Sequence, residues 1–364
     1  MRIVYGVFGY GRGHATRAMG VLPELTKRHQ VLLLAGGDAL EALAPVHPVI
    51  PIPTLRYAYA GSRLSALETL RQNYPVLSDL LSCGEEEQRV TDLLAAFKPH
   101  VAICDVDPFT HRAAARLGVP RISFDHFGIL AYCRPHVPLR HRPAASRDAL
   151  VYRLLVGQPE RAIVSSFYSA PPVRSGVRCV GPLLRDDLFA VKAERGDEVL
   201  VYLNQGRHQY TPHVEHALRA LDNPVLVYGT GEEGTDGSIT YRRTDNRRFI
   251  EDMARCRALV CTAGNQIVGE ALHLGKPLLV LPEESTEQRI NACAVERLGI
   301  GEQVSFGDLK AGVLRRFLSR TESYVERMRW LARDGRRDAV DALERFAAEL
   351  TAGRGPVERF RRAA

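Results

Sequence analysis

The sequence of 364 residues has no apolar run long enough to cross a membrane. Arg12 and Arg17 interrupt its first apolar stretch early, so we expect no secretory leader. Its seven cysteines are irregularly spaced and form no C-x-x-C pair, which favours neither a disulfide framework nor a zinc site. The single tryptophan, Trp330, is expected to be a packing residue. These absences predict a cytoplasmic protein.

Charge of one sign is only slightly in excess. The 49 basic and 42 acidic residues give a formal net charge of +7, and no stripe of Lys and Arg alternates with aromatic residues. Nucleic acid is therefore not an expected partner. A mild basic excess suits a phosphorylated ligand or an anionic surface, which leaves peripheral contact with the inner face of a membrane open.

The order of apolar segments predicts the fold class. Short apolar runs alternate with helix-like segments, among them a long, mostly helical region at residues 64–97. The strands expected in the first half span residues 2–8, 29–36, 46–52, 100–104, 120–124, 161–166 and 177–181. The pattern then restarts, with strands at 198–204, 224–229, 258–264 and 277–282. This alternation predicts an α/β protein with two doubly wound, Rossmann-like parallel sheets.

The chain length fits two domains, each able to bury a core. A proline and charged residues after the strand at 177–181 predict a hinge. We therefore expect an N-terminal domain of residues 1–184, a C-terminal domain of 185–340, and a C-terminal helix and tail, 341–364, that packs back on the first domain. Doubly wound sheets bind ligands beyond the carboxyl ends of their strands, so the domains should face each other across a cleft. Both a monomer and a homodimer fit this expectation.

The first strand leads into a glycine-rich turn, residues 9–14. It does not match G-x-G-x-x-G, and no acidic residue ends a second strand at the expected distance, so a nicotinamide cofactor is disfavoured. We expect Gly11, Arg12 and Gly13 to leave room where two substrates approach. His14 starts the next helix, whose dipole disfavours a protonated imidazole, so it could accept a proton or serve only as a helix-start residue.

Polar side chains at other strand ends could assist His14. Asp105 could bond one ring nitrogen of the imidazole and leave the other as a proton acceptor. Asp107 precedes a proline and should cap the next helix, although the pair of aspartates could instead bind Mg²⁺ or Mn²⁺. Asp125 and His126 follow the next strand and are candidates for contact with an acceptor.

The second half contains a candidate phosphate site. A strand ends at Thr262, Gly264 and Asn265, where a helix begins and its free N–H groups could hold a phosphate. Glu270, about a turn and a half further on, could accept hydrogen bonds from a ribose. Two more side chains that could bind a sugar follow the next strand: Glu287 and Gln288. The alternative is an ordinary βαβα unit with surface carboxylates.

These residues, in this order, resemble the donor-binding half of inverting nucleotide-sugar glycosyltransferases of the GT-B fold, in the MurG-like branch (glycosyltransferase family 28). The matching elements are F-I-x-D-M at 249–253, the turn at 262–265, E-A-L at 270–272, G-K-P at 275–277, E-Q at 287–288 and N-A at 291–292. In the first half, the turn at 9–14, D-x-D-P at 105–108 and V-G-P at 180–182 match less densely. Ala263 departs from relatives that carry glycine or serine there.

The resemblance implies a metal-independent transferase with a nucleotide sugar, UDP-linked, as co-substrate and no further cofactor. His14 would deprotonate the acceptor, and Asp105 would orient the imidazole of His14. On the donor side, the resemblance implies contacts from Asn204, Gln205, Gly206, Phe249, Ile250, Thr262, Gly264, Asn265, Glu270, Glu287 and Gln288. On the acceptor side, the candidates are Gly11, Arg12, Gly13, Asp107, Asp125 and His126.

The acceptor would be a hydroxyl or amine of a small molecule or of a lipid-linked glycan. Two other functions of the same fold stay open. One is a nucleotide-sugar 2-epimerase or hydrolase, because the carboxylates could also act on the sugar itself. The other is a non-catalytic protein that binds a sugar nucleotide.

Overall fold

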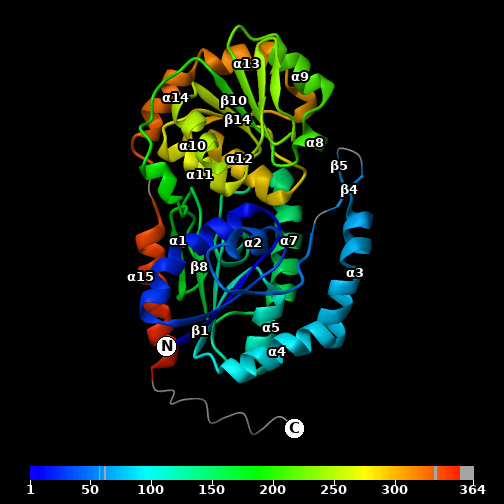
Figure 1. Ribbon diagram of the computed structural model, residues 1–364, viewed down its shortest axis with the longest axis vertical. Helices are drawn as coiled ribbons and strands as arrows, with labels where there is room; N and C mark the ends of the chain where they lie inside the picture. The colour runs from blue at the N-terminus through cyan, green and yellow to red at the C-terminus, as the bar shows by residue number, and fades with distance from the viewer. Residues whose placement is uncertain (57, 61–62, 332–333, 353–364) are drawn as a thin grey trace.

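The computed structural model describes residues 1–56, 58–60, 63–331 and 334–352. Each half of the chain forms one seven-stranded sheet covered by helices, and the two units are stacked along the long axis of the molecule (Figure 1). Residues 353–364 of the predicted C-terminal tail lie outside the described residues. Within the described residues, no helix has both the length and the apolar character needed to cross a membrane.

The first sheet is parallel throughout, as expected for buried apolar strands joined by helices. Its order is β3 (Val49–Pro51), β2 (Gln30–Ala35), β1 (Arg2–Val7), β6 (Val101–Asp105), β7 (Arg121–Asp125), β8 (Arg161–Ser165) and β9 (Val177–Val180). β1 and β6 are neighbours, with Val7 opposite Asp105. The turn after β1 and the carboxylate at the end of β6 therefore meet at one edge of the sheet.

Helices cover both faces of this sheet. They are α1 (Arg12–Arg28), α2 (Gly37–Leu43), α3 (Ala66–Ser82), α4 (Glu85–Phe97), α5 (Pro108–Arg116), α6 (Gly128–Tyr132), η1 (Leu139–His141) and α7 (Arg142–Val156), with a hairpin of β4 (Tyr59–Ala60) and β5 (Arg63–Leu64). The predicted long helical region is broken into α3 and α4 because Cys83 adopts a left-handed conformation, with φ of 60°. Helix α7 was not among the predicted elements.

The second sheet repeats the parallel pattern with one exception. Its order is β12 (Gly234–Asp236), β13 (Ile239–Arg242), β11 (Val225–Tyr228), β10 (Val199–Tyr202), β14 (Ala258–Cys261), β15 (Leu278–Val280) and β16 (Gly301–Gln303). The four predicted strands form its centre. The edge strands β12 and β16, and the strand β13 next to β12, were not predicted, and β12 pairs with β13 in the antiparallel direction.

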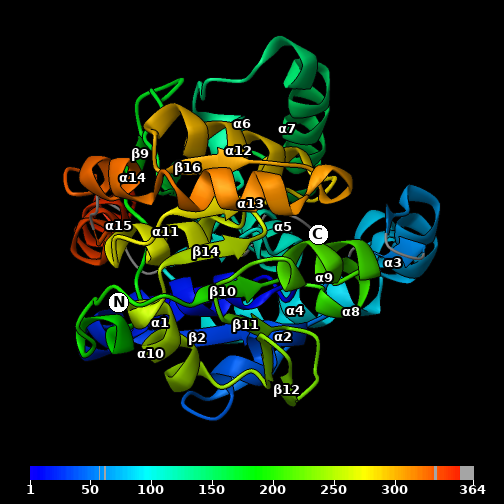
Figure 2. The ribbon, with the colours of Figure 1, turned by 90° about the horizontal axis from the view of Figure 1, so that it is seen from above.

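Around the second sheet lie η2 (Asp186–Phe189), α8 (Gly206–Gln209), α9 (Pro212–Arg219), α10 (Asn246–Arg255), α11 (Asn265–His273), α12 (Thr286–Leu298), η3 (Phe306–Asp308), α13 (Ala311–Leu318) and α14 (Thr321–Met328). Seen from above in Figure 2, this sheet has α10, α11 and α12 packed on one face, whereas α9 and α13 pack on the other. Trp330 follows α14 in a turn and is 84% exposed, so the prediction that it is a packing residue is wrong.

The last helix, α15 (Arg336–Thr351), returns to the first unit and lies beside α1 (Figure 1). It begins before the predicted boundary at residue 341. Its apolar face, with Leu343 and Phe346, joins the core formed by α1 and the first sheet. A hydrogen bond of 2.8 Å from the Gly335 N–H to the carbonyl of Pro182 holds the start of α15 against the first unit.

Leu343→Ala should destabilise the protein by about 2–5 kcal/mol, because the truncation removes apolar contacts and leaves a cavity in the core of the first unit. Urea denaturation measures this loss. The matched control is Asp341→Ala, an exposed residue of the same helix, whose effect should stay within about 0.5 kcal/mol. Equal stabilities of the two variants would contradict the docking of α15.

Candidate active site

The turn between β1 and α1 is shaped by its glycines. A Cβ at Gly9 would lie 2.3 Å from the carbonyl oxygen of Gly36, so only glycine allows this close approach. Gly11 is the N-cap of α1 with φ of 84°, a conformation that favours glycine. Its N–H donates to Asp38 at 2.7 Å. These constraints bring the start of α1 to the edge of the first sheet.

The first turn of α1 lies at the boundary with the second unit. A Cβ at Gly13 would lie 3.7 Å from the Cβ of Gln266 on α11. Burial and the charge of Glu270 raise the pKa of Tyr202, at the end of β10, and the exposed Arg12 opposes that rise across the boundary. The predicted contacts of this turn with an acceptor stay predictions.

His14 and Asp105 are in contact, as the sequence predicted. Nδ1 of His14 lies 2.7 Å from Oδ1 of Asp105. Because a carboxylate oxygen only accepts, Nδ1 carries a proton, and in the neutral ring Nε2 then holds the lone pair. Among the described residues nothing hydrogen-bonds to Nε2, and the side chain is 12% exposed. The ring is also close enough to Glu287 of α12 that a positive charge on it would act to lower the pKa of that carboxyl.

Arg17 completes this group, and the sequence reasoning missed it. Its Nε donates to Oδ2 of Asp105 at 2.9 Å, and the side chain is 4% exposed. Burial alone would raise the pKa of Asp105, but the charge of Arg17 and the hydrogen bonds from His14 and Arg17 lower it below its usual range. The available signal was the spacing of three residues between His14 and Arg17, which puts both side chains on one helix face.

Asp107 and Asp125, the two aspartates expected on the acceptor side, are bonded to groups of the first unit. Asp107 caps α5, with its oxygens accepting from the N–H groups of Phe109 (3.1 Å) and Thr110 (2.9 Å). Asp125 accepts from the Gly128 N–H (2.6 Å), and the hydroxyls of Ser123 and Tyr152 also bond to it. Each is only 1% exposed, so the predicted acceptor contacts of Asp107 and Asp125 are corrected to structural roles.

The same geometry bears on the alternative metal site. The oxygens of Asp105 are bonded to side chains of α1, whereas those of Asp107 are bonded to the backbone of α5. Burial raises the pKa of Asp107 to about 6. The two carboxylates therefore point to different partners rather than to one shared cation.

His126 bridges the two units instead of facing an acceptor. Nδ1 lies 3.0 Å from the carbonyl oxygen of Ser165, and Nε2 lies 3.1 Å from Oδ1 of Asn291 on α12. Burial lowers the pKa of His126 to about 4, so the ring is neutral near pH 7 and donates to one of these oxygens at a time. Asn291 is fully buried and also donates to the carbonyl of Ala263 at 2.9 Å.

The start of α11 also touches the first unit. Gly264 is its N-cap, and the side chain of Asn265 accepts from the Phe167 N–H (3.1 Å) and donates to the Ser165 carbonyl (3.2 Å). The side chain of Asn265 is thus engaged by the first unit, and the predicted phosphate contact stays a prediction for the backbone N–H groups of Gly264 and Asn265. Thr262, just before the turn, is 2% exposed.

Glu270 is engaged by a residue that the sequence reasoning missed. Arg185 donates from Nε to Oε1 at 2.8 Å and from Nη2 to Oε2 at 2.5 Å, and Gln266 adds a third bond to Oε1. Glu270 is 1% exposed. Its carboxylate is therefore not presented to a ribose, in contrast to the expectation, because Arg185 arrives from the linker between the sheets.

The residues expected near the base and diphosphate differ in exposure. Phe249 and Ile250 are 5% and 0% exposed in the core of the second unit, so a base can meet only their backbone. Asn204 is exposed at the end of β10, next to Gln205. Gly206 has no room for a side chain, because a Cβ would lie 2.2 Å from the carbonyl oxygen of Gly229.

Of the two residues expected at the sugar, only Glu287 has free surface near His14. Gln288 is 8% exposed, and its Oε1 accepts from the backbone N–H groups of Ala263 and Glu283, both at 3.1 Å. Glu287 is 17% exposed. Burial, helped by Glu283, raises the pKa of Glu287 to about 7, even though the hydrogen bond from Asn291 and the charge of Arg17 act to lower it.

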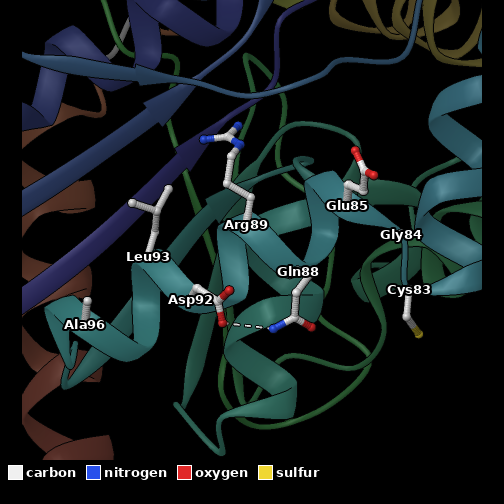
Figure 3. Close-up of a pocket in the computed structure, with 8 residues that line it drawn as sticks. All are labelled: Cys83, Gly84, Glu85, Gln88, Arg89, Asp92, Leu93 and Ala96. Carbon is white, nitrogen blue, oxygen red and sulfur yellow. Dashed lines mark hydrogen bonds between the residues drawn. The ribbon is translucent and has the colours of Figure 1, made fainter.

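A separate hollow on the first unit contains none of these residues (Figure 3). It lies along α4 and is lined by Cys83, Gly84, Glu85, Gln88, Arg89, Asp92, Leu93 and Ala96. Figure 1 shows α4 at the end of the first unit opposite the second unit. The residues with candidate chemistry are thus at the boundary between the units, not in this hollow.

Comparisons with known proteins agree with this architecture. The model of glycosyl transferase family 1 matches residues 1–322. An uncharacterized glycosyltransferase of Methanosarcina acetivorans is 22% identical, over 96% of this chain and 95% of its own. The structure of Phytolacca americana UGT2, complexed with UDP-2-fluoro-glucose and pterostilbene, is similar with a TM-score of 0.68 at 15% identity, covering 96% of this chain and 98% of that chain. Acinetobacter baumannii MurG is similar with a TM-score of 0.58 at 14% identity, over 94% and 99%.

Two Rossmann-like units with these similarities define a glycosyltransferase of the GT-B fold. The chain belongs to glycosyl transferase family 1. It is therefore a transferase, and the alternative of a non-catalytic binding protein is set aside. Membership of the MurG-like branch stays a prediction, since the matching family model is that of family 1.

Glu287→Gln should change how stability depends on pH. With a pKa raised to about 7, the folded protein holds a proton that the unfolded chain releases from about pH 4.5 upward. The free energy of unfolding of the native protein should therefore fall, relative to that of the variant, as the pH rises through this window. Urea denaturation across the window measures the difference. Glu284→Gln, an exposed neighbour, should follow the native protein, and parallel curves for Glu287→Gln would refute the assignment.

Proposed function

We propose that the protein is an inverting glycosyltransferase that moves a sugar from a nucleoside diphosphate to a hydroxyl or amine acceptor, with His14 as the general base. The observation that carries this proposal is the bond of 2.7 Å between Nδ1 of His14 and Asp105, which leaves Nε2 as a proton acceptor at the boundary between the units. A base oriented by a carboxylate in this way is a recurring arrangement for activating a hydroxyl.

The residues of this chain would act in one displacement. Nε2 of His14 takes the proton of the acceptor hydroxyl as its oxygen bonds to the anomeric carbon. The bond from that carbon to the diphosphate oxygen breaks, and the electron pair leaves with the diphosphate. Asp105 stabilises the imidazolium that forms, and the backbone N–H groups at Gly264 and Asn265 face the leaving charge. Attack opposite the departing group inverts the anomeric carbon.

The proposed donor is a UDP-sugar. In support, the Phytolacca americana structure is a complex with UDP-2-fluoro-glucose. On the donor side, Glu287 would bind the sugar and the backbone of Ile250 would meet the base. The acceptor is proposed to be a small molecule or a lipid-linked glycan. A cytoplasmic location, with peripheral membrane contact for a lipid-linked acceptor, is part of the proposal, and the seven free cysteines suit a reducing compartment.

UDP should raise the thermal midpoint of unfolding, because a ligand that binds only the folded state stabilises it by about 2.7 kcal/mol at a hundredfold excess over Kd. A thermal-shift comparison of UDP with the diphosphates of thymidine, guanosine and adenosine shows which nucleobase the site prefers. A larger shift with another base would redirect the donor assignment. No shift with any of them would contradict a nucleotide site.

His14→Ala should lower the rate of sugar transfer by about 10²–10⁴-fold, the usual contribution of a general base. The measurement is release of the nucleoside diphosphate with an acceptor that supports transfer by the native protein, together with the anomeric configuration of the product by NMR. His213→Ala, on the exposed face of α9, is the control and should transfer at the native rate. A near-native rate for His14→Ala, or a retained configuration, would overturn the proposal. Fast turnover without acceptor would instead favour the hydrolase or epimerase.

A further inference from the structure

Arg17 occupies an unusual position for a cation. It lies on α1, one turn after His14, and is only 4% exposed. Its Nε is 2.9 Å from Oδ2 of Asp105, and its Nη2 is 3.3 Å from Oδ1, the oxygen that also accepts from His14. One planar guanidinium thus spans both oxygens of the carboxylate, while His14 holds one of them.

The charges in this group require a cation other than the histidine. Asp105 is fully buried, and an ionised carboxylate without water must be neutralised by a neighbouring positive charge. Were Arg17 absent, the imidazolium form of His14 would be the cation nearest to it. A histidine held as an imidazolium carries a proton on Nε2 and cannot remove one from a substrate. Arg17 supplies the charge instead.

The position of the guanidinium also opposes a second proton on the ring. Nη2 of Arg17 lies 3.2 Å from Nδ1 of His14. Both are donors when Nδ1–H points to Asp105, so this is a contact between two groups that share an acceptor and not a hydrogen bond. A positive ring at this distance would meet a like charge, which disfavours the imidazolium.

We propose that Arg17 is a positioning residue that neutralises Asp105 and thereby keeps His14 uncharged, with the proton on Nδ1 and Nε2 free, a role that rests on the proposed function of His14 as the base. Arg17 touches neither substrate in this scheme. It acts through Asp105, by fixing the charge and the orientation of the carboxylate that holds the ring.

Other ionisable groups face this cluster from every side. Tyr5 of β1 is buried, which raises its pKa well above the usual value, so it stays neutral. His126, after β7, is neutral near pH 7 because burial lowers its pKa to about 4. Burial raises the pKa of Asp125, which bonds to Ser123 and Tyr152 rather than to Arg17. Burial raises the pKa of Glu287, across the boundary, to about 7, and its negative charge would favour an imidazolium. Arg17 is the group that opposes this effect.

The test follows the ring nitrogens of His14 by NMR in protein labelled with ¹⁵N-histidine, with the signals assigned by their loss in His14→Gln. In the native protein near pH 7 we expect one protonated nitrogen, Nδ1. In Arg17→Met and Arg17→Gln, the pH at which these signals titrate should rise by about one unit or more, the size expected when a charge within a few ångströms is lost. Arg17→Lys keeps the charge and should titrate near the native protein.

The control is Arg28→Met, on the exposed side of the same helix, which should leave the titration of His14 unchanged. Titration of both neutral variants at the native pH would overturn the proposal, as would a rise in Arg17→Lys equal to that in Arg17→Met. A doubly protonated His14 in the native protein near pH 7 would overturn it as well, without any variant that has to fold.

Transfer kinetics separate this proposal from the proposed function. In Arg17→Met the acidic limb of kcat/KM should move to higher pH, and the rate should recover at alkaline pH, whereas a purely structural defect would lower the rate at every pH. His14→Ala should not recover at any pH. Native-like transfer by His14→Ala would refute the assignment of His14 as the general base. The NMR titration would still decide whether Arg17 keeps His14 uncharged.

Discussion

The buried carboxylate of Asp105 links helix α1 to a central strand of the first sheet. It ends β6, directly beside the end of β1, and both side chains that bond to it, His14 and Arg17, come from the helix that follows β1. A buried charge tolerates little displacement of its partners, because an unpaired carboxylate in this setting costs several kcal/mol. The angle at which α1 leaves the sheet, and with it the position of His14, is therefore set by an electrostatic requirement as much as by packing.

A second polar group holds the two units together. The carbonyl oxygen of Ser165 accepts a hydrogen bond from the side chain of Asn265 on α11 and lies 3.0 Å from Nδ1 of His126. Nε2 of His126 in turn contacts Oδ1 of Asn291 on α12. Both α11, with Asn265 and Glu270, and α12, with Glu287 and Gln288, are thus bonded to the unit that carries the candidate base. These bonds join residues of one unit to residues of the other, so a change in the relative position of the units would break several of them together. The distance between base and donor site is in this way coupled to one hydrogen-bonded network.

Much of the fold could be predicted, because its central strands are continuous apolar runs such as residues 2–8 and 258–264. The edge strands β12 and β16 of the second sheet could not, because every residue of β12 is exposed and β16 consists of a glycine and two polar residues. The contact of His14 with Asp105 was predictable from two strand ends. The partners of Glu270, Asp125 and Gln288 were not, since Arg185, Tyr152 and the N–H of Glu283 reach them only through tertiary packing.

The return of α15 to the first unit bears on how the chain folds during synthesis. The apolar faces of α1 and of the first sheet are covered partly by Leu343 and Phe346, which leave the ribosome long after the residues that they cover. The second unit, whose strands and helices are contiguous in the chain, can complete its core earlier. The core of the second unit is then completed before the core of the first unit, which is the reverse of the order of translation. Until α15 emerges, the apolar surface that Leu343 and Phe346 later cover stays exposed on the nascent first unit, where it could promote aggregation.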